Sequence, residues 1–465
     1  MYYKSLLDTH LRGQTLRDPS MKSEAAFYRR LEQSLDVSRK RGGCIALKPR
    51  WEDDVLDFTS SDFLSLSRSG RIRDTSMEEL ARCGDFRLSA SGSRTQYGNY
   101  DYLNVVEREI STFHNADTAW ICHSGFLANI AIFEAVPLPG DAIVWDEFSH
   151  ASTALGVNLS NAAQKISFKH NDIDALRDVL TSLRDEDASF RSGAKSILIC
   201  VESNYSMEGD ICPLLEFVQL AKELFPAGNA QFVIDEAHSS GVLGPRGGGL
   251  IQELGLEKDI AIRVHVCSKA LGATGGVILC NQTILNVIIQ NTRSLTYSGA
   301  PSIPMVACIR AGYQLLRNGH TQDQQNHIQE IVKYFLQSIT DHPVWQEAVD
   351  EGLITVPLAD EWQQRPYHSH IMPILLHHGH EMYLFYHLII ANMDAYPISY
   401  PTVPKGASRI RLVFHAHNSY EEIDALVAAI RDWASEMIEI SQSGNKSSLP
   451  SAARKVDSMQ LTRQS

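Results

Sequence analysis

The alternation of short apolar runs with amphipathic stretches in the middle of the chain constrains the fold most. Runs such as DAIVWD, SILICVES and QFVIDEA are rich in strand-forming residues, and each is followed by a loop or a stretch with helical spacing. Strands that alternate with helices in this way form βαβ units. Such units build a mostly parallel sheet that is covered by helices on both faces. The sequence therefore predicts an α/β fold.

Changes in this pattern predict the domains. An early stretch, 21–42, has apolar residues at helical spacing among many charges, which indicates a surface or arm helix within an N-terminal segment, 1–55. The strand-rich region predicts a large domain, 56–315. The later runs HIMPILL and SRIRLVFHA, with the helical stretches around them, predict a smaller α+β domain, 316–440. The Ser-rich tail, 441–465, has little apolar surface to bury, so we expect disorder there.

Composition excludes several classes of protein. The chain has 465 residues and a formal net charge of -13, which argues against binding to nucleic acid, because such proteins need a basic face. Its eight cysteines form no CxxC pair and several lie in apolar runs, as is typical of reduced thiols in a cytoplasmic protein. No apolar run is long enough for a membrane helix, and the first residues do not resemble a signal peptide.

Polar residues follow several of the predicted strands, where parallel sheets bind their ligands. Ser124 and Gly125 stand between WICH and a helical stretch, and backbone N–H groups at such a helix start either bind an anion or form an ordinary capped turn. Asp235 closes the run QFVID, and His238 follows three residues later. His150 follows the run DAIVWD. Considered alone, each of these residues could equally be structural.

Lys269 is the residue that indicates which chemistry these strand-end residues could support. It lies in VCSKALGATGG among small residues that would desolvate the amine and lower its pKa. A phosphate turn, a strand-end carboxylate and such a lysine, in this order, are what pyridoxal 5′-phosphate (PLP) requires. A nicotinamide cofactor is disfavoured because no GxGxxG follows a first strand. We predict no metal site, because the histidines around IMPILL lack metal-ligand spacing. They are His368, His370, His377, His378 and His380.

These segments make the chain, from about residue 55 to about 435, resemble the α-oxoamine synthases, a PLP-dependent family. The matching motifs follow in family order: SSDFLSLS, SGSRTQYGNY, SGFLAN, SHAS, ESNYSMEGD, DEAHSSGVLG, SKALGATGG and YPTVPKGASRIRL. The resemblance implies fold type I of the PLP-dependent transferases, with a mostly parallel seven-stranded sheet in the large domain and a smaller C-terminal domain. It also implies a homodimer with a shared active site, to which the glycine loop, 91–100, and Ser298 contribute across the interface.

The resemblance also implies roles for individual residues. Lys269 would bind PLP as a Schiff base, and Asp235 would keep the ring nitrogen protonated. His238 and Ser206 would hydrogen-bond near the ring oxygen, and His150 would stack on the ring. The remaining contacts to the cofactor are expected from Ser124, Gly125, Phe126, Ser268 and Ser298.

Two residues are expected to contact the substrate, and three positions depart from the family's pattern. Arg411 matches an arginine that binds the amino-acid carboxylate, and Thr402 matches a further substrate contact. Ser399 replaces an arginine of the 8-amino-7-oxononanoate synthases, which argues against a pimeloyl thioester as substrate. Val266 replaces a threonine that usually contacts the phosphate, so phosphate binding would depend more on Ser268 and Ser298. Leu103 replaces a histidine after the glycine loop.

The reaction implied by the resemblance is decarboxylative condensation of a small amino acid with an acyl thioester, giving an α-amino ketone. The thioester would be carried by coenzyme A or by an acyl carrier protein. An aldolase, lyase or aminotransferase reaction on the same scaffold is the alternative, because a fold does not determine its reaction. A non-catalytic regulatory subunit is disfavoured because Lys269 and Asp235 are both present. The amino acid and the acyl chain are left open.

Overall fold

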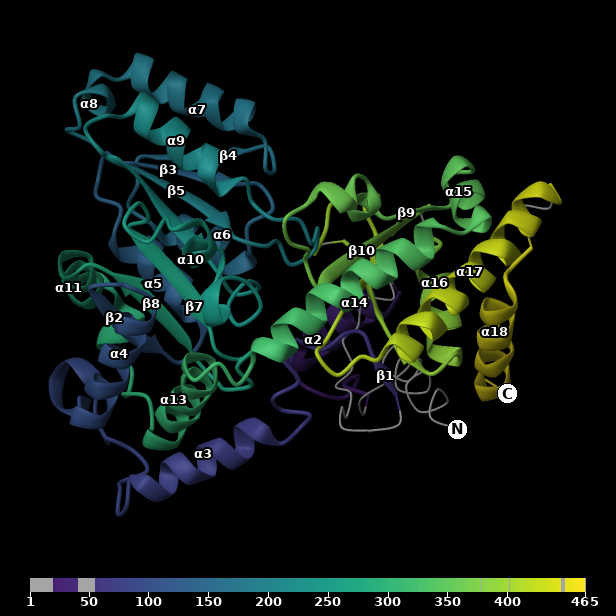
Figure 1. Ribbon diagram of the computed structural model, residues 1–465, viewed down its shortest axis with the longest axis horizontal. Helices are drawn as coiled ribbons and strands as arrows, with labels where there is room; N and C mark the ends of the chain where they lie inside the picture. The colour runs from purple at the N-terminus through teal and green to yellow at the C-terminus, as the bar shows by residue number, and fades with distance from the viewer. Residues whose placement is uncertain (1–19, 41–54, 378, 401, 445–447, 465) are drawn as a thin grey trace.

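The larger lobe of the molecule is built around a seven-stranded sheet (Figure 1). The structure is a computed structural model that describes residues 20–40, 55–377, 379–400, 402–444 and 448–464. The strand order is β2-β8-β7-β6-β5-β3-β4, and β8 alone runs antiparallel to its neighbours. The strands are β2 (Thr118–Cys122), β3 (Ala142–Asp146), β4 (Gln164–Phe168), β5 (Ile197–Glu202), β6 (Ala230–Asp235), β7 (Ile262–Val266) and β8 (Gly276–Cys280). The predicted α/β fold is confirmed.

Strand β5 is apolar over most of its length because both faces of the sheet are covered there. Successive side chains of a strand point to opposite faces. Accordingly, Ile197 and Ile199 of β5 pack in the core with α7 (Ile173–Glu186) and α9 (Leu214–Leu224). Leu198 and Cys200 pack in a separate core with α5 (Gly125–Ala135) and α6 (Ala151–Leu159). A continuous apolar run is thus the signature of a central strand here.

The other helices of this lobe lie around the sheet and its edges. The antiparallel strand β8 packs between β2 and β7, and α4 and α13 cover that end of the sheet through a third apolar core. These helices are α3 (Arg71–Arg82), α4 (Asp101–Phe113), α8 (Ala188–Arg191), α10 (Leu250–Leu254), α11 (Gln282–Asn291), α12 (Arg293–Thr296) and α13 (Ile303–Arg317). The glycine loop contains a short π-helix, Arg94–Gly98.

The smaller lobe has an antiparallel sheet of order β12-β13-β10-β9, and helices pack on it. A second, two-stranded sheet pairs β1 with β11. The strands are β1 (Leu56–Asp57), β9 (Ile354–Thr355), β10 (Ile371–Leu376), β11 (Met393–Asp394), β12 (Tyr396–Ile398) and β13 (Arg409–Val413). The helices are α14 (Gln322–Thr340), α15 (Pro343–Asp350), α16 (Glu381–Ile390), α17 (Tyr420–Gln442) and α18 (Ser451–Gln464).

Two findings differ from the expected domain limits. β1, which we expected to open the large domain, pairs with the small lobe, and Phe58 N–H donates to Asp394 O at 2.9 Å. The tail that we expected to be disordered contains α18, whose Ala452, Ala453 and Val456 are buried. α18 packs against α16, so these apolar residues stabilise a helix that the Ser-rich composition did not predict.

The early helix is present as α2 (Ala26–Lys40), and its apolar residues face solvent. Phe27 is 67% exposed and Leu31 is 51% exposed. Among the described residues no helix is long and apolar enough to span a bilayer.

Candidate active site

The carboxyl ends of β2, β3, β5, β6 and β7 lie at one edge of the sheet because these strands run in the same direction. This edge faces the small lobe (Figure 1). Glu202 and Asp235 are paired residues at the last positions of β5 and β6. Lys269 follows β7, and His150 follows β3. Residues that follow separate strands in the sequence therefore lie together at this edge of the sheet.

Lys269 is half-buried, and its amine lies 2.8 Å from His238 Nε2. Burial lowers the pKa of Lys269 to about 8, although the negative charges of Asp235 and Glu202 act in the opposite direction. His238 is buried, and burial, followed by the nearby charge of Lys269, holds its pKa well below its usual value. A neutral imidazole therefore stands beside an amine that loses its proton more easily than a surface lysine.

Asp235 is a buried carboxylate whose two oxygens are both held. Asn129 Nδ2 donates to Asp235 Oδ2 at 2.8 Å, and the N–H of Ala237 donates to Oδ1 at 2.9 Å. Asn129 also donates to Ser152 Oγ at 3.0 Å, and Ser152 Oγ lies 2.7 Å from His150 Nδ1. This hydrogen-bonded chain fixes the carboxylate relative to the ring of His150, an exposed residue whose ring lies 6.0 Å from the Phe126 ring.

The turn before α5 has the geometry of an anion site. Ser124 caps the helix, and its Oγ accepts the N–H of Leu127 at 3.1 Å. The N–H groups of Gly125 and Phe126, at the first two positions of the helix, have no acceptor within it. A Cβ atom on Gly125 would lie 2.3 Å from Val266 Cγ2, so only glycine allows the turn to pack against the end of β7. The helix dipole favours negative charge at this position.

Arg411 lies on β13 and reaches the site from the small lobe. Its guanidinium donates to Ser206 O at 3.2 Å, and no carboxylate of the described residues forms an ion pair with it. Its neighbour Arg409 instead pairs with Glu208 at 3.0 Å. Burial lowers the pKa of Arg411. The positive charge of Arg411 in turn lowers the pKa values of Lys269 and His238. Arg411 is therefore a cation that faces the site and is available to an anionic ligand.

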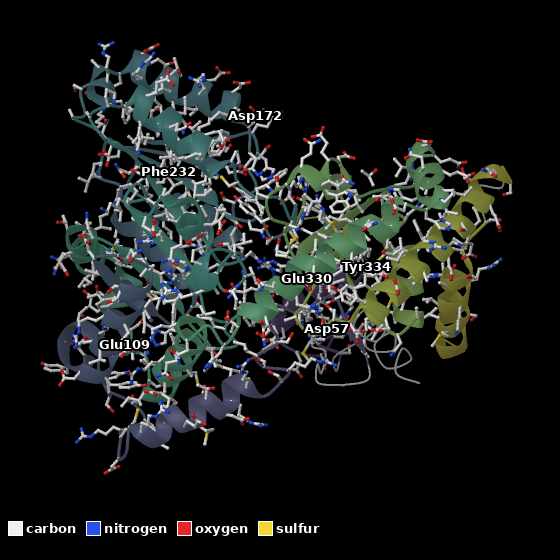
Figure 2. The ribbon with its side chains drawn as sticks, in the orientation of Figure 1. Asp57, Glu109, Asp172, Phe232, Glu330 and Tyr334 are labelled. Atoms are coloured by element: carbon white, nitrogen blue, oxygen red, sulfur yellow. The ribbon has the colours of Figure 1, made fainter. Side chains whose placement is uncertain are left out.

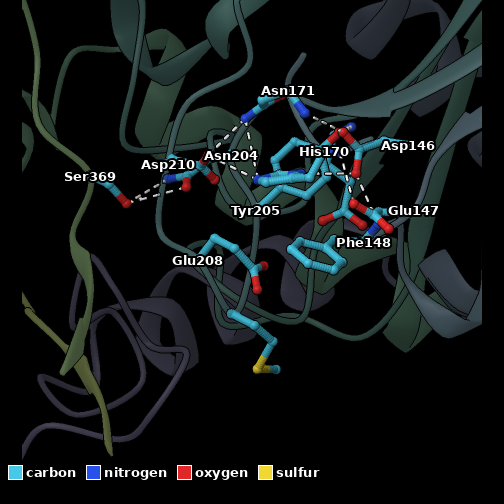
Figure 3. Close-up of polar contacts among 12 residues, drawn as sticks. Asp146, Glu147, Phe148, His170, Asn171, Asn204, Tyr205, Glu208, Asp210 and Ser369 are labelled. Atoms are coloured by element: carbon cyan, nitrogen blue, oxygen red, sulfur yellow. Dashed lines mark hydrogen bonds and ion pairs between the residues drawn. The ribbon is translucent and has the colours of Figure 1, made fainter. Parts of the chain in front are cut away.

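A half-buried histidine, His170, holds the loop between β5 and α9, the loop that carries Ser206 (Figure 3). His170 Nδ1 lies 2.9 Å from Asp146 Oδ1, and its Nε2 lies 2.9 Å from Asp210 Oδ2. Burial disfavours charge on this ring, but the hydrogen bonds and negative charges of the two carboxylates raise its pKa to about 10. On the other side of the loop, Asn204 Nδ2 donates to Ser369 Oγ of the small lobe at 3.0 Å. The loop is thus fixed to both lobes.

Not every predicted residue joins this group. Ser298 donates to the Ser294 carbonyl and lies in the segment that packs against the glycine loop. Ser268, next to Lys269, and Thr402 are exposed, and no hydrogen bond connects either of them with the group among the described residues. The proposed contacts of these three residues stay predictions.

Sequence reasoning assigned no role in this site to four residues that the structure places there. Glu202 is buried, accepts the N–H of His150 at 2.5 Å, and has a pKa raised well above its usual value by burial and then by the charge of Asp235. Asn129 orients Asp235, as described above. The Phe63 ring lies 4.1 Å from the His370 ring and 5.8 Å from the His238 ring, so it forms a wall of the site. All but His370 lie in motifs that the sequence had already indicated.

The residues present fit PLP. The α5 turn offers N–H donors for a phosphate, and Asp235 offers a fixed carboxylate for a ring nitrogen. Lys269 offers an amine with a lowered pKa for an aldehyde. His238 Nδ1 is buried and has no hydrogen-bond partner, as expected of a donor or acceptor reserved for a ligand.

Comparisons with known proteins agree with this geometry. A family model described as aminotransferase class I and II matches residues 53–430. An aminoacyl transferase, sphA, from Aspergillus fumigatus is 46% identical over 448 residues, which cover 96% of this chain and 95% of the relative. The 8-amino-7-oxononanoate synthase of Emericella nidulans is 37% identical over 401 residues, which cover 82% and 90% of the two chains.

One solved structure shows the likeness of fold. A serine palmitoyltransferase from S. paucimobilis, solved with bound PLP–myriocin, superposes with a TM-score of 0.69 at 20% identity. The match covers 91% of this chain and 100% of that chain. At this identity the similarity supports the fold and not the choice of substrate.

Proposed function

Because the chain belongs to the aminotransferase class I and II family and, within it, to the α-oxoamine synthases, we propose that Lys269, Asp235 and Arg411 carry the chemistry of that family here. The protein is a PLP-dependent acyltransferase. It condenses a small amino acid with an acyl thioester, with loss of CO2, to give an α-amino ketone. The observation that supports our assignment best is the 2.8 Å contact between the Lys269 amine and a neutral His238, beside the fixed Asp235 carboxylate.

PLP, when bound, supplies an aldehyde for an amine and a pyridinium ring that takes up the electrons of the substrate α-carbon. Asp235 would hold the proton on the ring nitrogen and keep the ring electron-poor. The N–H groups of Gly125 and Phe126 would bind the phosphate, and His150 would stack on the ring. His238 and Ser206 would hydrogen-bond near the ring oxygen. Ser124, Ser268 and Ser298 are proposed as further contacts.

Lys269 is the proposed base. Its Nζ takes the α-proton of the amino acid, and a pKa near 8 is suited to a group that must release and accept a proton near neutral pH. Arg411 binds the carboxylate of the amino acid, because it is the cation of the site without a carboxylate partner among the described residues. Thr402 is proposed as a second substrate contact. The proposed amino acids are glycine, alanine and serine, and the acyl donor is a thioester of coenzyme A or a carrier protein.

The reaction is tested by mixing the holoenzyme with each of the three amino acids and a series of acyl-CoA thioesters. Release of free thiol together with CO2, in equal amounts, is expected. An aldehyde or a keto acid formed without thiol would contradict the assignment and indicate lyase or aminotransferase chemistry. Lys269→Ala is the control, since it removes the proposed base and should release neither product.

We also propose a homodimer in the cytoplasm. The glycine loop and the segment after α12 pack together, with Ala300 N–H donating to Gly92 O at 3.2 Å. Two aromatic side chains of these segments are open to solvent: Tyr97 is 87% exposed and Tyr297 is 76% exposed. Exposed aromatics that gather in one place are typical of an interface. The unpaired cysteines among the described residues are consistent with a reducing compartment.

Light scattering with size-exclusion chromatography tests the dimer. The wild type should have the mass of two chains, and Tyr97→Asp combined with Tyr297→Asp should shift it towards one. Leu138→Asp, at a position that is 57% exposed outside these segments, should leave the mass unchanged. A wild-type monomer with full activity would refute the shared site.

A further inference from the structure

Three potential metal ligands from distant parts of the chain meet in the small lobe. Asp57 ends β1, and His415 and His417 follow β13. One ligand atom from each side chain lies within 4.8 Å of the other two. His415 is fully buried, and the other two residues are half-buried. Figure 2 labels Asp57 in this lobe, below α14 in that view.

The two imidazole rings are oriented by outer hydrogen bonds. His415 Nε2 lies 2.8 Å from Ser60 Oγ, which can donate or accept, and 2.9 Å from the Ser60 carbonyl oxygen, which can only accept. The contact with the carbonyl requires the hydrogen on Nε2, and this tautomer leaves the lone pair on Nδ1. His417 Nδ1 lies 2.8 Å from Ser65 Oγ. The opposite nitrogens, His415 Nδ1 and His417 Nε2, are buried and have no hydrogen-bond partner. Buried polar atoms without partners are costly and require an explanation.

This arrangement has the outer hydrogen bonds that are typical of metal-binding histidines. Such residues usually donate one ring N–H to a carbonyl or another fixed acceptor, which leaves the second nitrogen to the metal. Asp57 is also fixed, because its Oδ1 accepts the N–H of Thr59 at 2.9 Å and of Ser60 at 2.8 Å. Two imidazoles and one carboxylate form a donor set suited to zinc and its neighbours in the first transition series.

Burial and hydrogen bonds favour the forms of the ligands that bind a metal. The backbone N–H groups of Thr59 and Ser60 donate to Asp57 and so favour its carboxylate form. Burial of the His417 ring disfavours its charged form and lowers its pKa. Arg68 is a nearby cation that opposes a metal.

We propose that Asp57, His415 and His417 bind one divalent transition-metal ion of the zinc type, with water completing its coordination. This proposal departs from our expectation of no metal site, which considered the histidines around IMPILL and not these three residues. The bound ion would fasten the segment after β1 to the loop after β13. That segment carries Phe63, whose carbonyl accepts the N–H of Ala416 at 2.8 Å and whose ring forms a wall of the active site. The ion is therefore a structural one that supports the site and takes no part in the proposed reaction.

Metal content and thermal stability test this proposal on the holoenzyme. The protein is dialysed against a chelator, titrated with ZnCl2 or CoCl2, and followed by calorimetry, elemental analysis and the visible absorbance of Co²⁺. We expect one ion per chain and a melting temperature that rises with ZnCl2 but not with MgCl2. His417→Ala should weaken Zn²⁺ binding at least about a hundredfold, and the outer-shell variant Ser65→Ala about tenfold.

His320→Ala is the matched control, because His320 is an exposed histidine away from the three ligands, and it should leave the metal content unchanged. Should His417→Ala fold poorly, His417→Gln gives the same comparison, since its melting temperature should not respond to ZnCl2. Wild-type protein that takes up no zinc after dialysis would overturn the proposal. One equivalent of zinc retained by both His417 variants would overturn it as well.

Discussion

Replacing His170 by glutamine should destabilise the fold in a way that depends on pH. The His170 side chain is only 13% exposed and joins the buried Asp146 to Asp210, which holds the loop that carries Ser206 (Figure 3). Glutamine can hydrogen-bond to one carboxylate, but it cannot supply the positive charge that both require. The variant therefore leaves two negative charges close together without a cation, and such uncompensated buried charge is costly.

The pKa of His170 sets the size of the effect. Its value rises from 6.5 in the unfolded chain to about 10 in the folded protein, and this difference of 3.5 corresponds to at most about 5 kcal/mol. A group with a raised folded pKa contributes this stability fully below the unfolded value. The contribution is lost as the pH rises through the folded value, by about 1.4 kcal/mol for each pH unit.

Urea unfolding of the wild type and of His170→Gln at pH 6, 7, 8 and 9 measures this directly. The gap in unfolding free energy should be largest at pH 6 and should shrink by about 3 kcal/mol by pH 9. His320→Gln, at an exposed histidine, should show no such gap. A gap for His170→Gln that stays constant from pH 6 to 9 would refute the charged bridge and leave only a packing role for the ring.

Three further predictions concern the proposed site. Apoenzyme should take up PLP faster as the pH rises through about 8, because only the neutral Lys269 amine adds to the aldehyde; a rate independent of pH would contradict the lowered pKa. Arg411→Gln should raise KM for the amino acid about ten- to hundredfold and leave KM for the thioester unchanged, since a hydrogen bond to a charged group contributes about 1.5–3 kcal/mol. An equal rise in KM for the amino acid and in KM for the thioester would show that Arg411 does not bind the amino-acid carboxylate. Gly125→Ala should destabilise the fold by about 1–3 kcal/mol, because its Cβ would overlap Val266, and Val266→Ala should restore part of this loss in the double variant.

The sequence was most informative where the chemistry is local to one strand end. Asp235 and Lys269 each follow a recognisable apolar run, and the parallel direction of those runs is enough to bring them to one edge of the sheet. The same logic indicated Gly125 and His150. Glu202 also ends an apolar run, SILICVE, but only the pairing of β5 with β6 places it beside Asp235.

Contacts between distant segments could not be predicted in this way. A hydrogen bond from the N–H of Val413 to Phe58 O, 2.8 Å long, brings the segment of Asp57 beside that of His415. Neither stretch of sequence contains a signal that predicts this contact. The tail is a second example, since its polar composition suggested disorder, while α18 packs on α16 and buries Ala452, Ala453 and Val456. Composition measures how much apolar surface a segment has, but a neighbouring helix decides whether that surface becomes buried.

Packing around Gly125 explains how the site can lack the threonine that Val266 replaces. Val266 Cγ2 occupies the space that any side chain at position 125 would need, and a Cβ on Gly276 would lie 2.6 Å from the N atom of Gly125. The start of α5 is therefore held tightly between the end of β7 and the start of β8. A valine cannot donate a hydrogen bond to a phosphate, but it fixes the backbone N–H groups that can. Because a fixed donor loses little conformational entropy when it binds an anion, rigidity of the turn can compensate for the missing hydroxyl group.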